Sequence, residues 1–205
     1  PFVVGKNMSI NLINDVVLPA GFVGAGISAG IKRSGKRDLM LVASDRPAAC
    51  AGVFTTNQVQ AAPVKLDREV VKRKTARALI VNSGNANACT GAKGMRDAKA
   101  MAALTAKLLK VKAAEVLVCS TGAIGKPMPM NTVSAGIRSI VPALAPSGGP
   151  AAADAIMTTD TRKKTATVKL AIDGKPVTIT AFAKGAGMIE PNMATMLGFF
   201  FTDAA

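Results

Sequence analysis

A strand–helix–strand order in the middle of the chain is the feature that most constrains its fold. Ala78–Asn82 and Glu115–Cys119 are short apolar runs typical of strands, and the pattern between them predicts a helix over about Met95–Lys110. Two strands joined by such a helix normally lie parallel in one sheet, with a right-handed crossover. The polar loops Asn82–Gly91 and Ser120–Gly125 then both lie at the carboxyl edge of that sheet, where ligands bind in open α/β sheets. We therefore predict that these two loops line one site.

Turn signals and apolar runs predict the remaining elements. Pro142 would end a helix, and Asp173-Gly174 between two alternating runs is a strong hairpin signal. The expected strands are Asp38–Ser44, Ala51–Thr55 and the hairpin pair Thr165–Ile172 and Pro176–Ala183, and the expected helices are Asn131–Val141 and Ala151–Met157. A chain of 205 residues can bury a sizeable core, as one large domain or two small ones.

The segment Lys184–Phe201 gives the strongest indication of chemistry. Its glycines and a proline lead to Ala194 and then to Thr195, which opens an apolar run. A threonine hydroxyl is a poor nucleophile without a neighbouring base, and an N-terminal threonine can use its own α-amine as that base. The chain contains no histidine, so Ser–His and Cys–His catalysis within these residues is excluded. The alternative is structural, because a β-branched residue such as Thr195 often opens a strand.

Three further positions are candidates for binding or catalysis, and each has a structural alternative. Thr121 and Gly122 follow a strand, and they predict either an oxyanion hole or a simple turn. Lys184 can pair with a substrate carboxylate or be one of many surface lysines. Thr158 can supply a hydroxyl to a ligand or belong to a turn. Asp160 beside a basic segment can be a surface ion pair of little energetic weight.

The formal net charge of +14 allows three interpretations. It can be a solvated basic surface, it can attract small anionic substrates, or it can bind nucleic acid. The third interpretation lacks its usual companions, because aromatic residues make up only 3% of the chain and the sequence contains neither a Cys/His metal motif nor a dense arginine cluster. We expect no nucleic-acid partner and no bound metal.

The cysteines and one apolar stretch indicate where in the cell the protein is located. Cys50, Cys89 and Cys119 are odd in number and widely spaced, which indicates reduced cysteines in a cytoplasmic protein. Val16–Ile31 is apolar, but it is too short to span a membrane comfortably and contains Pro19 and four glycines. We expect no membrane association.

Several motifs in their order along the chain resemble the ornithine acetyltransferase family, also called glutamate N-acetyltransferases of the cyclic arginine pathway. The motifs are Gly30–Leu39, Gly52–Val64, Val81–Gly91, Ser120–Gly125, Met157–Thr161 and Lys184–Leu197. Each motif alone is weak, whereas together they cover almost the whole chain and are highly specific. The resemblance implies an α+β fold in which helices pack on a large mixed β-sheet.

The resemblance also implies a self-cleaving precursor and assigns roles to individual residues. Cleavage would fall between Ala194 and Thr195, and Thr195 would become the nucleophile and contact substrate. Thr121 and Gly122 would form the oxyanion hole. Thr158 and Lys184 would bind substrate. The implied activity is transfer of an acetyl group from N-acetylornithine to glutamate through an acetyl-threonine intermediate, with no cofactor and with acetyl-CoA as a possible second donor.

The same resemblance implies how the polypeptide is divided. Residues 1–194 would be an α chain that forms a single α+β domain, and residues 195–205 would be the start of a β chain whose remainder is absent. The implied partner is that β chain, in an α2β2 heterotetramer. The fragment alone would lack part of the site.

Two other functions remain open at this stage. A self-processed threonine could serve an aminopeptidase or amidase, in which water rather than glutamate accepts the acyl group. A basic module that binds nucleic acid is the weaker alternative, and it would require binding with a steep dependence on salt.

Overall fold

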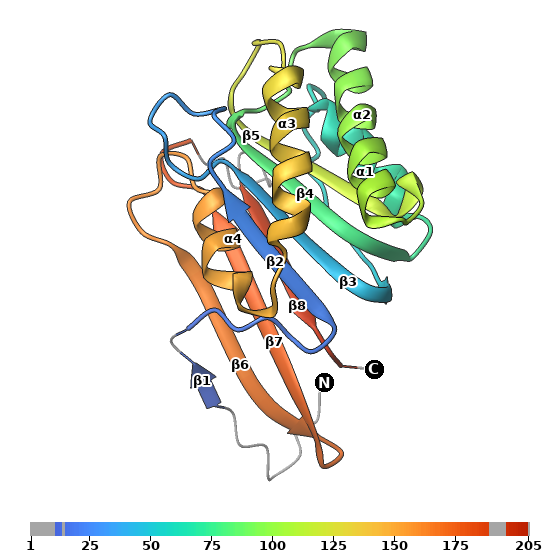
Figure 1. The fold of residues 1–205 in the computed structure, drawn as a ribbon, viewed down its shortest axis with the longest axis vertical. Coiled ribbons are helices and arrows are strands. Elements are labelled where there is room, and N and C mark those ends of the chain that lie inside the picture. Colours follow the sequence, from blue (N-terminus) through green and yellow to red (C-terminus); the bar gives the residue numbers. More distant parts are fainter. Residues whose placement is uncertain (1–10, 14, 189–195, 205) are drawn as a thin grey trace.

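The strands divide into two four-stranded sheets that lie face to face (Figure 1). The computed structural model describes residues 11–13, 15–188 and 196–204. The mixed sheet has the order β2 (Phe22–Ile27), β3 (Leu39–Ala49), β4 (Thr75–Asn85) and β5 (Val116–Ala123). The antiparallel sheet has the order β1 (Asn11–Ile13), β6 (Lys164–Ile172), β7 (Lys175–Lys184) and β8 (Leu197–Thr202).

The helices cover the mixed sheet. They are α1 (Ala62–Val71), α2 (Gly91–Leu109), α3 (Met130–Ile140) and α4 (Gly149–Ala155), with short 3-10 turns at Ala113–Glu115, Val141–Ala143 and Pro146–Gly148. Helices α2 and α3 pack on one face, and α1 lies against β5 and α2. Helix α4 packs against β2 and β3, and its residues join the core on the side of the antiparallel sheet (Figure 1).

Strand β3 shows why the mixed sheet is apolar on both faces. Leu39 and Leu41 belong to the cluster shared with α2 and α3, whereas Met40 and Val42 belong to the cluster shared with α4 and the antiparallel sheet. All four side chains are almost fully buried. Burying one such side chain contributes roughly 1.5–3 kcal/mol. A continuous apolar run, rather than an alternating one, is what a sheet covered on both faces requires.

Phenylalanine side chains pack between the antiparallel sheet and the mixed sheet. The ring of Phe201 in β8 lies 5.4 Å from Phe182 in β7 and 5.6 Å from Phe22 in β2, measured between ring centroids. Phe200, the next residue back in β8, points the other way and is 79% exposed. The antiparallel sheet therefore buries one face against the rest of the molecule.

This architecture confirms the α+β class and most of the predicted elements. The strands β3, β4 and β5, the helices α2, α3 and α4, and the β6–β7 hairpin all lie where the sequence predicts them. The large mixed sheet of the prediction is in fact divided into two sheets, and helix α1 was not predicted.

The predicted strand Ala51–Thr55 is wrong. This segment has no regular secondary structure and lies against α1 instead of pairing with a strand. The Arg68 guanidinium donates a hydrogen bond to the Thr55 carbonyl at 2.9 Å and lies 5.3 Å from the centroid of the Phe54 ring. Arg68 thus binds the segment to α1, and the segment is not part of a β-ladder.

The apolar stretch Val16–Ile31 contributes β2 to the mixed sheet. Its glycines permit close packing, because a Cβ atom on Gly26 would overlap the Ala151 carbonyl group and lie 2.9 Å from the Ala152 nitrogen of α4. Within the described part of the chain, no helix is both long enough and apolar enough to cross a membrane.

Candidate active site

The carboxyl ends of β4 and β5 lie side by side, as the strand–helix–strand order predicts. The two strands pair in parallel, and the register places Gly84 opposite Gly122. The following loops also contact each other, because the Ala86 N–H donates a hydrogen bond to the Ala123 carbonyl at 2.9 Å. The prediction that the two polar loops share one edge of the sheet is confirmed.

Gly122 allows an unusually close approach of these two loops. Its φ of +132° lies in a region that residues with a side chain rarely adopt. A Cβ atom at this position would lie 2.6 Å from the Asn85 nitrogen and 2.8 Å from the Gly84 Cα. The geometry therefore requires glycine at position 122, whatever part its N–H takes in catalysis.

Buried asparagines fix the loop after β4. Asn82 accepts a hydrogen bond from the Ser120 hydroxyl at 2.6 Å, and its amide donates to the Asn85 carbonyl at 2.8 Å. The Asn85 amide donates to the carbonyls of Lys126 and Pro127, each at 3.1 Å. Side chains of one loop thus hold the backbone of the other, and the two loops form one frame.

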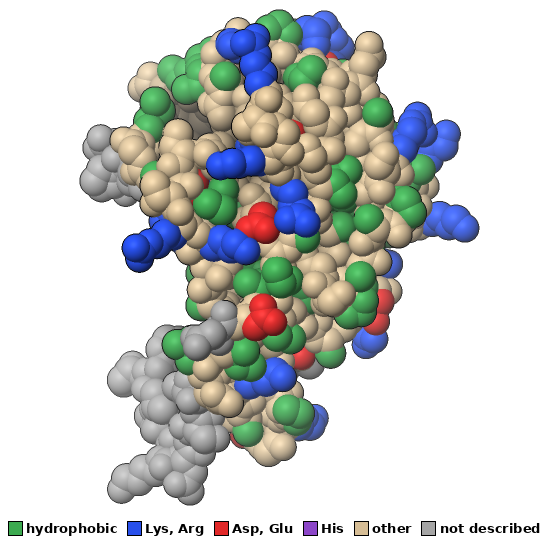
Figure 2. Space-filling model, turned by 60° about the vertical axis from the view of Figure 1, so that its left-hand side comes forward, with side chains coloured by type: hydrophobic (Ala, Val, Ile, Leu, Met, Phe, Trp, Pro, Cys, Tyr) green, Lys and Arg blue, Asp and Glu red, His purple; other side chains and the backbone are tan. Residues whose placement is uncertain are grey.

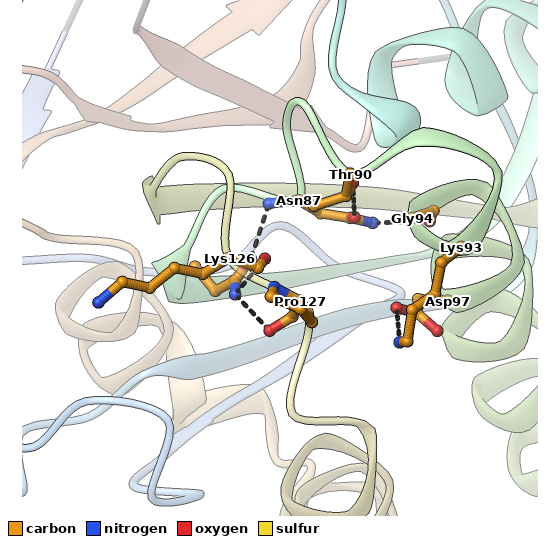
Figure 3. A network of polar contacts seen from close by, with 8 residues as sticks. Asn87, Thr90, Lys93, Gly94, Asp97, Lys126 and Pro127 are labelled. Atoms are coloured by element: carbon orange, nitrogen blue, oxygen red, sulfur yellow. Dashed lines mark hydrogen bonds and ion pairs between the residues drawn. The ribbon is translucent and has the colours of Figure 1, made fainter.

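Asn87 continues this frame to the start of α2 (Figure 3). Its amide donates to the Gly94 carbonyl at 2.9 Å, and its side-chain oxygen accepts from the Thr90 hydroxyl at 2.8 Å. The Lys126 side chain points away from these contacts (Figure 3). The amide of Asn87 is thus used for structure, so we assign it no chemical role.

The structure brings Lys184 and Thr121 together across 63 residues of sequence. The Lys184 ammonium donates to the Thr121 hydroxyl oxygen at 3.1 Å, and the two residues are only 3% and 7% exposed. Burial lowers the pKa of Lys184. Because an ammonium group can only donate, the Thr121 oxygen must accept here, and its own proton is left to donate elsewhere. A hydroxyl oriented in this way is suited to stabilising an oxyanion.

Thr158 is linked to the same region through Asp160. The Asp160 carboxylate accepts hydrogen bonds from the Thr158 N–H at 3.2 Å, the Gly185 N–H at 2.8 Å and the Lys164 ammonium at 2.6 Å. Burial raises the pKa of this carboxyl group, but these donors, with Lys164 foremost, lower it to about 2. The interpretation of Asp160 as a surface ion pair is wrong, because its side chain has no exposed area.

Lys32 is a residue near this region that the analysis of single positions missed. Its ammonium donates to the Met157 carbonyl at 2.6 Å and to the Arg37 carbonyl at 2.7 Å, so it ties its own loop to the residue before Thr158. Burial lowers the pKa of Lys32, which is also sensitive to the charge of Lys184. The one signal in the sequence was its place in the Gly30–Leu39 motif.

Asp38 holds the loop that carries Lys32. Its fully buried carboxylate accepts hydrogen bonds from the N–H groups of Ala29, Ile31 and Lys32 at 2.6, 2.7 and 2.8 Å. These hydrogen bonds hold the loop between β2 and β3 in place beside the site.

The predicted nucleophile Thr195 and the predicted cleavage partner Ala194 lie outside the described residues. The neighbouring residue Leu197, which begins β8, pairs with Lys184 in the antiparallel ladder. Thr195 precedes Leu197 by two positions in the sequence. The roles of both residues in cleavage stay predictions.

Asp67 of α1 supports the strand that carries Thr121. β5 is an edge strand, and its Val118 N–H donates to the Asp67 carboxyl group at 2.9 Å. The thiol of Cys119 donates to the second oxygen, with 3.6 Å between sulfur and oxygen. Burial raises the pKa of Asp67 to about 7, and burial also raises that of the Cys119 thiol, which stays protonated. Helix α1 thus provides a polar cap for β5.

This cap predicts an unusual dependence of stability on pH. The folded protein keeps the Asp67 proton up to a pH of about 7, whereas the unfolded chain loses it near 3.8, so the free energy of unfolding falls as the pH rises between these values. Asp67→Asn cannot ionise and keeps an oxygen for the Val118 N–H. We expect this variant to exceed the wild type in urea unfolding at pH ~8 by roughly 1–4 kcal/mol, and to match it within ~1 kcal/mol at pH ~4.

Asp97→Asn is the matched control for Asp67→Asn. Asp97 is also a buried helical carboxylate, but it forms an ion pair with Lys93 at 2.6 Å. Its replacement should give no gain in stability at the higher pH. An Asp67→Asn protein that is less stable than the wild type at that pH would contradict the assignment.

The face of the molecule seen in Figure 2 carries mixed charges rather than the basic patch typical of nucleic-acid binding. Figure 2 shows Lys and Arg side chains spread over one face, with Asp and Glu side chains among them rather than a continuous basic stripe. Within the described ranges, no group of three or more His, Cys, Asp or Glu side chains is placed to hold a metal ion.

The chain matches a family model over residues 23–205, and that model is described as the ArgJ family. The chain belongs to the ArgJ family. This match spans the loop at Lys32, both polar loops and the Lys184 segment, so the site lies within the matched residues.

Two curated relatives show how much of an ArgJ protein the chain represents. The arginine biosynthesis bifunctional protein ArgJ of Caldanaerobacter subterraneus subsp. tengcongensis is 56% identical over 190 residues, which are 93% of this chain and 47% of the relative. The protein of the same name from Symbiobacterium thermophilum is 57% identical over 196 residues, which are 95% of this chain and 49% of the relative. The chain spans about half the length of the curated relatives it matches.

Two solved structures share the fold. The arginine biosynthesis bifunctional protein ArgJ of Bacillus halodurans gives a TM-score of 0.85 at 38% identity, covering 92% of this chain and 100% of the solved chain. The ornithine acetyltransferase of Mycobacterium tuberculosis, complexed with ornithine, gives a TM-score of 0.84 at 44% identity. This match covers 91% of this chain and 100% of the solved chain. Both likenesses confirm the α+β fold with helices packed on the sheets.

Proposed function

We propose that the protein containing this chain is a glutamate N-acetyltransferase that moves the acetyl group of N-acetylornithine to glutamate in arginine biosynthesis. The observation that carries the proposal is the buried contact between Lys184 and Thr121 beside Gly122, in a chain of the ArgJ family. That contact leaves the hydroxyl proton of Thr121 free to donate to an oxyanion. The names of the relatives, which refer to arginine biosynthesis and to ornithine acetyltransferase, support the choice of substrate.

The proposed reaction begins with cleavage between Ala194 and Thr195. The freed α-amine of Thr195 takes the proton of its own hydroxyl, and the oxygen attacks the acetyl carbonyl of N-acetylornithine. Thr121 and Gly122 donate hydrogen bonds to the oxyanion of the tetrahedral intermediate. The C–N bond breaks, ornithine leaves with the proton, and the acetyl group remains on Thr195. The amine of glutamate then attacks the carbonyl carbon of this ester, and the C–O bond to Thr195 breaks. N-acetylglutamate leaves, and the proton lost by the glutamate amine returns to the Thr195 hydroxyl through the α-amine.

Lys184 and Thr158 are the proposed substrate-binding residues. The two segments are held to one another by Asp160, which binds the N–H groups of Thr158 and Gly185. The positive charges of Lys184 and Lys32 near this point suit substrates that carry carboxylates.

The proposed division into an α chain of residues 1–194 and a β chain that starts at Thr195 is supported by the lengths of the relatives. The solved chains are matched over 100% of their length by about nine-tenths of this chain, whereas the curated relatives are about twice as long. Such a difference fits relatives that are cut into two chains. The proposed assembly is an α2β2 heterotetramer in which the β chain completes the site. The free cysteines fit the cytoplasm as its compartment.

The test supplies isotopically labelled N-acetylornithine to the full-length protein, with and without glutamate. Transfer gives labelled N-acetylglutamate and ping-pong kinetics, whereas an amidase gives labelled acetate whether or not glutamate is present. Sequential kinetics without a trapped acetyl-enzyme would count against the proposal. Acetyl-CoA is the second donor to supply, because the relatives are named bifunctional proteins. We propose that no bound cofactor is needed.

Replacement of Thr121 tests the oxyanion hole. Thr121→Val keeps the shape of the side chain but removes the hydroxyl that accepts from Lys184 and would donate to the oxyanion. We expect kcat for acetyl transfer to fall by about 10²–10³-fold, because an oxyanion donor acts mainly in the transition state. Steady-state kinetics of Thr121→Ser, which keeps the hydroxyl, provide the control. A valine variant with nearly wild-type kcat would refute this role.

A further inference from the structure

One buried carboxylate joins the two segments that carry the proposed substrate-binding residues. The Oδ1 atom of Asp160 accepts from the Gly185 N–H at 2.8 Å and from the Lys164 ammonium at 2.6 Å, and Oδ2 accepts from the Thr158 N–H at 3.2 Å. Thr158 follows α4, and Gly185 is the residue immediately after Lys184 at the end of β7. Neither segment could shift relative to the other without breaking a charge-assisted hydrogen bond.

The same carboxylate acts on the charge of Lys184. The Lys184 ammonium is buried and donates to the neutral Thr121 hydroxyl. Burial lowers the pKa of Lys184, the negative charge of Asp160 raises it, and the positive charge of Lys164 lowers it. Burial lowers the pKa of Lys32, from the loop between β2 and β3, while the charges of Asp38 and Asp160 raise it and that of Lys184 lowers it. The negative charge of Asp160 thus favours the ammonium form of Lys184, against the effect of burial.

We propose that Asp160 is a positioning residue of this site, which holds Thr158 against the end of β7 and stabilises the Lys184 ammonium in its contact with Thr121. The expected change in acetyl transfer rests on the proposed function. The hydrogen bonds of Asp160 and its effect on the charge of Lys184 do not depend on which substrate binds. Asp160 does not touch the reacting atoms in this proposal. It acts through the Lys184 ammonium and through the backbone N–H groups of Thr158 and Gly185.

The proposal predicts opposite effects for two replacements that break the same ion pair. Asp160→Asn removes the negative charge, so the pKa of Lys184 should fall further below its ordinary value. Lys164→Met removes a positive charge near Lys184 while leaving the Asp160 carboxylate bound to the Thr158 and Gly185 N–H groups, so the pKa of Lys184 should rise. If the Asp160–Lys164 ion pair were purely structural, the two variants would not shift the pKa of Lys184 in opposite directions.

The experiment measures acetyl transfer by the full-length protein as a function of pH in the wild type, Asp160→Asn, Asp160→Glu and Lys164→Met. We expect Asp160→Asn to lower kcat/KM at least about tenfold, because charge-assisted hydrogen bonds to two backbone groups are weakened. Its alkaline limb, which reports loss of the Lys184 proton, should move to lower pH. The alkaline limb of Lys164→Met should move to higher pH, and Asp160→Glu should recover part of the loss by restoring the charge.

A second measurement separates failure of this inference from failure of the proposed function. NMR titration of lysine-labelled protein follows the Lys184 ammonium directly and needs no substrate. If the wild type transfers no acetyl group, the proposed function fails and the titration alone decides the inference. Unshifted titration in both variants, or wild-type kcat/KM in Asp160→Asn, would overturn it. If Asp160→Asn does not fold, the direction of the shift in Lys164→Met decides.

Discussion

Replacing Thr195 by alanine is expected to leave the full-length protein as one intact polypeptide and to abolish acetyl transfer. The proposed cleavage starts from the Thr195 hydroxyl, which attacks the preceding Ala194 carbonyl and forms an ester that water opens. Alanine has no oxygen for this step. The substitution also removes the nucleophile that would carry the acetyl group. The rate of acetyl transfer should therefore fall to that of the uncatalysed reaction.

Intact-mass spectrometry and a transfer assay on the same preparations check this result. The wild type should give two chains, the second of which begins at Thr195, and Thr195→Ala should give one. Thr195→Ser keeps a hydroxyl and is the control, which should still be cut and should keep part of the activity. Two chains from the alanine variant would show that the cleavage assignment is wrong, and a fully active uncut wild type would remove the proposed base.

Replacing Gly26 by alanine is expected to disrupt the packing of α4 on β2. A Cβ atom at this position would overlap the Ala151 carbonyl group and crowd the Ala152 nitrogen, and both are backbone atoms that cannot turn aside. The helix would have to move away from the sheet, and fully buried core residues such as Ile156 would lose their contacts. We expect the free energy of unfolding to fall by about 3 kcal/mol or more.

Urea unfolding of Gly26→Ala and Gly35→Ala, measured in parallel, distinguishes a steric clash with α4 from the cost of backbone strain. Gly35 has a φ of +69°, but a Cβ atom there would meet nothing within 4 Å. Its replacement should cost only ~1–2 kcal/mol, the usual cost of a left-handed residue with a side chain. Equal losses in the two variants would contradict the close approach of α4 and β2.

The movement of α4 also has a functional consequence. α4 ends at Ala155, which accepts a hydrogen bond from the buried Ser83 hydroxyl of β4 at 2.5 Å. Three residues later the chain reaches Thr158. A displaced α4 should therefore reduce transfer activity under conditions where Gly26→Ala still folds, even though Gly26 is not part of the proposed site.

Local patterns account for the elements that the sequence predicted correctly. The helix α2 has an imperfect apolar stripe, and the strands β4 and β5 are short apolar runs that end in polar loops, so their order alone predicts parallel pairing and a shared edge. Asp173-Gly174 predicts the hairpin because turn chemistry is local. The same reasoning brought the loops with Thr121 and Asn85 to one site.

Local patterns failed where a contact between distant residues decided the outcome. Ala51–Thr55 has the composition of a strand, but Arg68 holds it against α1. Asp160 has the appearance of a surface acid in a basic segment, yet its carboxylate also accepts a hydrogen bond from the Gly185 N–H, which is 25 residues away in the sequence. Lys32 is one lysine among many until its ammonium is seen between two carbonyl groups.

The amino-acid sequence by itself determined the class of the fold, the edge of the sheet at which the loops meet and the family to which the chain belongs. Those features follow from periodicity, turns and short motifs, each of which extends over a few neighbouring residues. Only the tertiary structure decided that the strands form two sheets, and that their packing brings Lys184 to Thr121 and Asp160 to Gly185. The physical reason is that burial and hydrogen bonding between separate elements depend on how apolar faces pack together, and one-dimensional spacing carries no record of which faces meet.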